Sequence, residues 1–255
     1  MLGPLALIAT LLFIAVAFVI GLRLLLLAAR TRGLPELTLG MALFLIVGLG
    51  YPVTLAGRAL LLGETPGLAG RVLLSLGSVL MNTGWAAVWF FTWRVFRPDA
   101  AWARALASGA IAALLLFAGV VLSRALIVEE PAALVRPNLA STGTLLLALA
   151  SYVWTAVESL RYWALLRRRQ TLGLADPVVT NRFLLWGLVA AFSFASLVGP
   201  TVAAVAGVDT TENPLVRLTT AVAGLVCSTA LALAFTPPRA YLHWLRARAS
   251  RAAPA

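Results

Sequence analysis

Few side chains of this 255-residue chain could do chemistry, and the most conspicuous is the carboxylate of Glu158. It lies in the hydrophobic stretch SYVWTAVESLRYWALLRRRQ, residues 151–170, on one helical face with Trp154 and Arg161. Near a membrane boundary, a pair with Arg161 would be a modest, partly hydrated interaction. If the hydrocarbon extends to Arg167, the carboxylate would lie about 13 Å deep and would require a partner. We favour the shallower position, because Arg161 would otherwise also be buried.

Other catalytic and cofactor chemistries lack the residues they need. The chain has no lysine, which excludes a covalent retinal Schiff base and a phosphate-binding G-x-x-x-x-G-K loop. One histidine, His243, and one cysteine, Cys227, do not supply the clustered ligands of an intramembrane metal or haem site. Glu158 offers a general base with no nucleophile or metal beside it. We therefore predict no catalytic residue, no metal, no cofactor and no enzymatic activity.

The elements that would position these side chains are hydrophobic helices in a bilayer. Hydrophobic residues make up 62% of the chain and the mean hydropathy is +0.97, far outside the range of soluble proteins. A membrane-spanning helix needs roughly 20 apolar residues. We predict an all-α integral membrane protein with seven spans at residues 3–22, 38–57, 72–93, 105–123, 142–162, 183–206 and 216–235. The first span lacks a basic leader and a cleavage site, so we expect it to be retained.

The arginines predict an orientation. All twenty basic residues are arginine, and short arginine-rich loops stay cytoplasmic. One side carries Arg23, Arg30, Arg32, Arg94, Arg97, Arg104, Arg161, Arg167, Arg168, Arg169, Arg182, Arg239, Arg246, Arg248 and Arg251; the other carries Arg58, Arg71, Arg124, Arg136 and Arg217. We therefore place the N-terminus outside and the C-terminus in the cytoplasm, in a bacterial inner membrane. Because the charge is spread over loops, it does not predict nucleic-acid binding.

The third span carries a polar and aromatic stripe. Its members recur at intervals of three and four: Ser75, Ser78, Asn82, Trp85, Trp89 and Thr92. The stripe should face the bundle interior, because an amide such as Asn82 would lack a partner in lipid. One interpretation is an interhelical hydrogen bond with aromatic packing. The other is a ligand-binding wall in which Trp85 and Trp89 cover an apolar molecule that Asn82 orients.

Two spans contain matched glycine and proline residues. The second span has Gly50 and Pro52, and the sixth has Gly199 and Pro200 at nearly the same distance from its cytoplasmic start. Proline removes a backbone donor and kinks a helix, so Pro52 and Pro200 are predicted hinges. Matched breaks of this kind occur near the central sites of repeat-built transporters, although chance coincidence is the alternative.

The end of the chain predicts a surface helix. After Pro237 and Pro238, the segment RAYLHWLRARAS alternates aromatic or leucine side chains with arginines. This pattern is typical of an interfacial amphipathic helix on anionic headgroups. We expect two parts in the chain: a seven-helix transmembrane bundle over residues 1–238 and a basic amphipathic tail over residues 239–255.

Our leading functional hypothesis is a membrane sensor that binds a small apolar or amphipathic ligand within the bundle. The predicted ligand-binding residues are Asn82, Trp85, Trp89, Trp154, Glu158, Trp186 and Ser193. The arginine-rich segment 163–182 would then signal to a cytoplasmic protein partner. The arrangement resembles rhodopsins and seven-helix receptors in topology only, which does not carry function. A small-solute or lipid transporter and a non-catalytic structural subunit are the alternatives.

Overall fold

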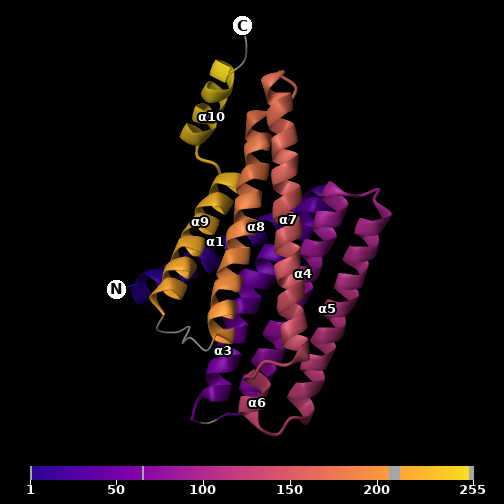
Figure 1. Cartoon of the computed structure of the whole chain (residues 1–255), viewed down its shortest axis with the longest axis vertical. Helices are drawn as coiled ribbons and strands as arrows, with labels where there is room; N and C mark the ends of the chain where they lie inside the picture. Colours follow the sequence, from indigo (N-terminus) through magenta and orange to yellow (C-terminus); the bar gives the residue numbers. More distant parts are fainter. Residues whose placement is uncertain (1, 65, 207–212, 253–255) are drawn as a thin grey trace. The chain divides into compact units, whose positions relative to one another are not determined.

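The chain is an all-helical integral membrane protein, as its computed structural model shows for residues 2–64, 66–206 and 213–252 (Figure 1). Seven helical segments are long and apolar enough to cross a bilayer: Gly3–Thr31, Leu34–Leu62, Leu68–Phe96, Ala101–Ile127, Pro131–Thr171, Pro177–Ala203 and Pro214–Phe235. The predicted set of seven hydrophobic spans is confirmed. The predicted orientation stays a prediction, as does the place of residues 239–255 on a membrane surface; residues 253–255 of that tail lie outside the described ranges.

The elements run in the order α1 (Leu2–Thr31), α2 (Leu34–Ala42), η1 (Leu43–Gly50), α3 (Tyr51–Leu62), α4 (Leu68–Phe96), α5 (Ala101–Ile127), α6 (Pro131–Val135), α7 (Leu139–Thr171), α8 (Pro177–Val205), α9 (Pro214–Phe235) and α10 (Arg239–Ala252). Prolines stand in the first turn of α2, α6, α8 and α9, where a missing N–H costs nothing. Most of the long helices extend beyond the predicted spans, because helix formation does not stop where the hydrocarbon would end.

Helix α7 is the clearest case of such an extension. It continues through the arginine run to Thr171, and its 33 residues correspond to a length of about 50 Å. The expected end of the fifth span at Tyr162 is therefore not a helix end. Because the helix outruns any bilayer core of about 30 Å, its end does not mark the membrane boundary, and the depth of Glu158 stays open.

The chain forms two compact units. One contains Ala17–Ser151, and the other contains Met1–Val16 with Tyr152–Ala255. We call them the central unit and the terminal unit. The division falls within α1 and within α7, so neither unit is a continuous run of whole helices.

The central unit is built around α4, which packs against α2, η1, α3 and α5. Glycines bring these helices close together. A Cβ atom at Gly84 would lie 3.1 Å from the backbone nitrogen of Ile46, and one at Gly77 would meet the backbone of Thr54 at 2.7 Å. Such short approaches leave room for hydrogen only, which is how small residues promote helix association in lipid.

Arg71 joins the start of α4 to the end of α5. Its guanidinium donates hydrogen bonds to the backbone oxygens of Ala125 at 3.1 Å and Glu129 at 2.6 Å, and also to that of Val128. The last carbonyl groups of a helix have no partner within the helix, and a cation there also complements the helix dipole. This one side chain therefore caps α5 and fixes the α4–α5 pair.

The second span contains a π-helix, η1, directly before Pro52. The N–H of Tyr51 donates to the carbonyl of Ile46, five residues back. In an α-helix the ring of Pro52 would clash with the carbonyl of Gly48, and the wider π-turn moves that carbonyl aside. The predicted irregularity at this break is thus accommodated within one uninterrupted helical stretch, Leu34–Leu62.

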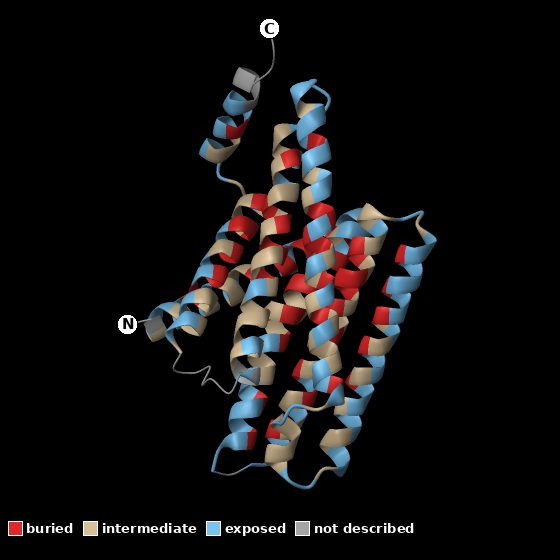
Figure 2. Cartoon of the chain, in the orientation of Figure 1, coloured by how far each residue is buried: buried red, intermediate tan, exposed pale blue. Residues whose placement is uncertain are grey.

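The terminal unit places α8 beside α9, and α10 also contacts α8 (Figure 1). Gly224 of α9 lies against the N-terminal part of α1, where an added Cβ would be 2.9 Å from the carbonyl oxygen of Ala9. Asn213 caps α9 by accepting from the backbone N–H groups of Leu215 and Val216. Figure 2 shows buried residues along α9, which include Ala221, Ala223 and Cys227.

Candidate functional site

The predicted ligand-binding residues fall in both units. Asn82, Trp85 and Trp89 belong to the central unit, whereas Trp154, Glu158, Trp186 and Ser193 belong to the terminal unit. The contacts of each group are therefore those of its own unit. A role of these residues in binding one ligand stays a prediction.

In the central unit, Asn82 is an interhelical link. Its side chain is 3% exposed, donates to the carbonyl of Ser78 at 2.8 Å and accepts from the hydroxyl of Thr144 at 3.1 Å. Helix α4 is thereby tied to α7. These bonds satisfy much of the amide without a ligand, which fits the first of the two interpretations drawn from the sequence.

The neighbouring tryptophans are deeply buried. Trp85 is 6% exposed and Trp89 3%. Among the described residues, the indole nitrogen of Trp85 and the hydroxyl of Ser75 have no hydrogen-bond partner. A buried donor without a partner costs roughly 1–3 kcal/mol, so the stripe of α4 contains both satisfied and unsatisfied polar groups.

In the terminal unit, Glu158 lies on the buried face of α7. Its side chain is 6% exposed, next to Ser159 at 0%, whereas Arg161 is exposed. The two members of the predicted Glu158–Arg161 pair thus differ sharply in burial, and the pair itself stays a prediction. Helix α8 approaches this face at Gly187, where an added Cβ would be 2.8 Å from the Leu160 side chain.

Trp154 and Trp186 are half-buried on α7 and α8, while Ser193 is buried. The hydroxyl of Ser193 lies 3.8 Å from the sulfur of Cys227, whose thiol also points to the carbonyl of Val189 at 3.6 Å. Ser193 and Cys227 therefore join α8 to α9. The single cysteine is thus buried as a packing residue between two helices.

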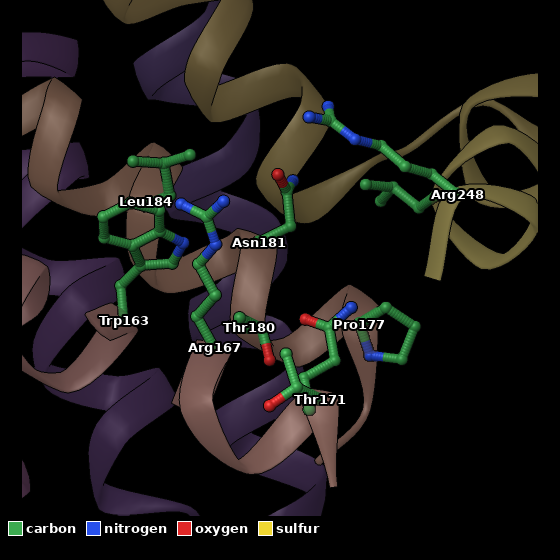
Figure 3. A pocket seen from close by; sticks show the side chains of 10 residues that line it. Trp163, Arg167, Thr171, Pro177, Thr180, Asn181, Leu184 and Arg248 are labelled. Atoms are coloured by element: carbon green, nitrogen blue, oxygen red, sulfur yellow. The ribbon is translucent and has the colours of Figure 1, made fainter. Parts of the chain in front are cut away.

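The terminal unit also contains a pocket of about 280 Å³ at the ends of α7, α8 and α10. Figure 3 shows side chains from all three helices around it, with Asn181 between the guanidinium groups of Arg167 and Arg248. The pocket is lined by Trp163, Arg167, Gln170 and Thr171 of α7, by Pro177, Thr180, Asn181 and Leu184 of α8, and by Leu245 and Arg248 of α10.

The connection between α7 and α8 forms one side of this pocket, and its shape is set by neighbouring residues of the connection itself. Gly173 adopts a left-handed conformation with a φ of 70°, and its N–H bonds the carbonyl of Gln170 at 3.0 Å. The N–H of Leu174 bonds the carbonyl of Arg169 at 2.9 Å, completing a glycine-based helix stop. Asp176 then starts α8 by accepting from the N–H of Val178 at 2.7 Å.

Helix α10 is held against α8 by a side-chain hydrogen bond. The amide of Asn181 donates to the phenolic oxygen of Tyr241 at 2.8 Å. Leu245, one turn further along α10, is 9% exposed and faces the pocket. The tail that the sequence predicts as a membrane-surface helix therefore forms one wall of this pocket.

The electrostatics of the pocket are dominated by arginine. Arg167 stacks on Trp163 with 5.5 Å from guanidinium carbon to ring centre, and Arg248 stacks on Trp244 at 5.4 Å. Within the described parts of the chain, neither guanidinium forms a hydrogen bond or an ion pair. Asp176, nine residues after Arg167, uses a carboxylate oxygen to cap α8. Both arginines are exposed and give the rim of the pocket a positive charge.

Sequence reasoning found part of this pocket. It singled out segment 163–182 as arginine-rich and assigned it to a protein partner, but it did not identify Gln170, Thr180, Asn181, Leu184 or Leu245 as lining residues. The glycine at 173 followed by Asp176 and Pro177 could have indicated a tight turn between two helices. The contribution of α10 had no local sequence signal.

No protein family, no curated protein and no solved structure matches this chain. The fold and the sites must therefore be interpreted from their own chemistry.

Proposed function

We propose that this protein is a seven-helix membrane sensor that binds the head of a small amphipathic ligand in the α7–α8–α10 pocket. The proposal places the N-terminus outside and the pocket on the cytoplasmic side of a bacterial inner membrane, as the arginine distribution favours. One observation carries it: two arginines that have no hydrogen-bond or ion-pair partner among the described residues line a cavity of about 280 Å³ together with apolar side chains.

The lining suits a molecule with one polar and one apolar part. Trp163, Leu184 and Leu245 supply apolar surface, whereas the two arginines, Gln170 and Asn181 supply hydrogen-bonding groups. Ligand sites commonly combine an apolar lining with a few polar groups that orient the ligand. A purely apolar molecule would leave the guanidinium groups uncompensated, so we prefer an amphipathic ligand to an apolar one.

The sensing step would be a change in the docking of α10. This helix touches the pocket through Leu245 and Arg248, and the Asn181–Tyr241 hydrogen bond holds it to α8. A ligand that contacts α10 together with α7 and α8 binds the docked state more tightly than the undocked state and shifts the population toward docking. A cytoplasmic partner could then distinguish the two states of α10.

Hydrogen exchange of residues 239–252 tests this proposal in purified, full-length protein. Addition of an amphiphile that binds the pocket should slow exchange in α10, and Arg167→Gln should abolish the slowing. Arg168→Gln, an exposed neighbour with the same charge change that does not line the pocket, is the matched control. If no amphiphile changes exchange in α10, the sensor proposal is wrong and a structural subunit becomes the better interpretation.

A transporter is the second candidate, and the π-helix η1 favours it. A π-turn within an α-helix is often found at a functional site, and this one lies beside a glycine and proline pair of the kind found near transporter sites. Uptake of a solute into proteoliposomes, lost in Pro52→Ala and Pro200→Ala but not in Arg167→Gln, would support transport over sensing.

A further inference from the structure

The hydrogen-bonding groups of the arginine pocket restrict what it can hold. Thr171 and Thr180 donate their hydroxyl protons to the backbone oxygens of Arg168 at 2.8 Å and Asp176 at 2.9 Å. Their oxygens therefore offer only lone pairs to a ligand. A fitting head group needs acceptors for the arginines and hydroxyl donors for the threonines.

The arginines have the groups that bind an oxyanion. Their guanidinium carbons lie over the rings of Trp163 and Trp244, at 5.5 and 5.4 Å from the ring centroids, and each guanidinium has N–H groups along its edges. Those edges match the spacing of oxygen pairs on phosphate, and charge-assisted bonds of this kind are the stronger class. An ammonium group, by contrast, would meet two like charges.

The size of the cavity limits the occupant to a head group. At about 280 Å³ it is slightly smaller than the usual range for small-molecule sites, roughly 300–1,000 Å³. It lies at the end of a hydrophobic span, and Trp163, Leu184 and Leu245 supply an apolar side. Basic pockets between spans on the cytoplasmic side are a recurring form of lipid head-group site.

The geometry points to an anionic glycerophospholipid as the ligand, with its phosphodiester between Arg167 and Arg248 and a hydroxylated head facing Thr171 and Thr180. This inference rests on the proposed function, whose ligand it specifies. Phosphatidylglycerol has the required chemistry: one phosphodiester anion and a head with two hydroxyl groups. Free phosphate esters share the anion but lack the acyl chains.

Native mass spectrometry of the full-length protein released from nanodiscs tests the inference. At equal mole fractions, phosphatidylglycerol should be retained over phosphatidylcholine and phosphatidylethanolamine. Phosphatidic acid, which has the phosphate without the head hydroxyls, should be intermediate. Arg167→Gln and Arg248→Gln should each reduce phosphatidylglycerol retention about tenfold, because each removes charge-assisted hydrogen bonds.

The matched controls are Arg168→Gln on α7 and Arg246→Gln on α10, both exposed and outside the pocket. They should change retention less than about twofold if binding is local. Equal losses in pocket and control variants would show a general charge effect and overturn the site. A far-UV circular dichroism melt of each variant shows whether it is folded. Arg167→Lys is a further variant that keeps the positive charge but loses the paired N–H donors of the guanidinium.

Soluble competitors distinguish the source of the phosphate. Millimolar glycerol 3-phosphate or inorganic phosphate should not displace the retained lipid. Displacement by either would identify a soluble anion as the occupant and overturn the lipid assignment. If another amphiphile, such as a fatty acid, is retained in an Arg167-dependent way while phosphatidylglycerol is not, this inference fails and the proposed function stands. If no amphiphile is retained, both fail.

Discussion

At Gly50 the second span, which passes through a π-helix before Pro52, leaves no room for a side chain, whereas at Gly199 of the sixth span a methyl group would fit. A Cβ at Gly50 would lie 2.6 Å from Cγ of Met81 and 3.1 Å from its backbone nitrogen. Among the described residues, a Cβ at Gly199 would meet the Thr219 hydroxyl oxygen at 3.8 Å, which is an ordinary van der Waals contact. Two breaks that look alike in sequence therefore differ in packing. The first permits the close approach of α4, and the second does not need a glycine to make space.

This difference also bears on the transporter hypothesis. Internal repeats would place equivalent sites at equivalent breaks, but the surroundings of Gly50 and Gly199 are unlike. The terminal unit contains the less crowded break, the arginine pocket and helix α10. We therefore expect functional motion at α10, whose docking the proposed sensing step uses.

The largest expected effect comes from filling the tight break. Gly50→Ala should lower the free energy of unfolding by about 1–3 kcal/mol, because the added methyl group overpacks the α4 contact. Gly199→Ala is the matched control and should change it by less than about 0.5 kcal/mol, since helix propensity gains are offset by the restriction before Pro200. Thermal melts in detergent measure both. Equal effects of the two variants would remove the contrast between the breaks.

A substitution of Arg71 tests how much the cap at the end of α5 stabilises the central unit. Arg71→Met should cost about 1.5 kcal/mol, because it removes three backbone bonds at the end of α5. Arg58→Met, at an exposed arginine of α3, should be nearly neutral. Urea titration followed by circular dichroism compares the two variants. A neutral Arg71→Met would show that the α4–α5 pair holds without this cap.

Docking of α10 should be weaker than either of these features. Tyr241→Phe removes the acceptor for Asn181 and should raise the undocked population of α10 about fivefold, which corresponds to about 1 kcal/mol. Hydrogen exchange of residues 239–252 reports the change, with residues 68–96 as the internal reference. Unchanged exchange in α10 would mean that apolar contacts, such as those of Leu245, hold this helix by themselves.

The smallest expected effect lies at the buried amide link of the central unit. Thr144→Val removes the hydrogen bond to Asn82 and should cost about 0.6 kcal/mol, a typical value for interhelical side-chain bonds in membranes. A double-mutant cycle with Asn82→Leu isolates the coupling. Zero coupling would reopen the interpretation of Asn82 as a ligand-binding residue, because its side-chain oxygen would then contribute nothing to the link between α4 and α7.

Prediction from sequence succeeded where a local pattern carries the information. Seven apolar stretches of span length identified the helices, and the spacing of three and four on α4 placed Asn82 on a buried face. It was less successful at helix ends such as Thr171, because arginine and glutamine continue a helix as well as leucine does. The residues that line the pocket come from three helices, and only segment 163–182 was recognisable in the sequence, by its arginines.

Hydropathy and arginine content by themselves determined that this chain is a membrane protein with seven helices, because lipid requires every backbone polar group to be bonded within its own segment. Tertiary structure decided the rest: that a side chain would not fit at Gly50 but would fit at Gly199, that Asn82 pairs with Thr144, and that α10 completes a cavity with α7 and α8. These features depend on contacts between residues far apart in the chain. Periodicity along one helix says which face is buried, but not which partner that face meets.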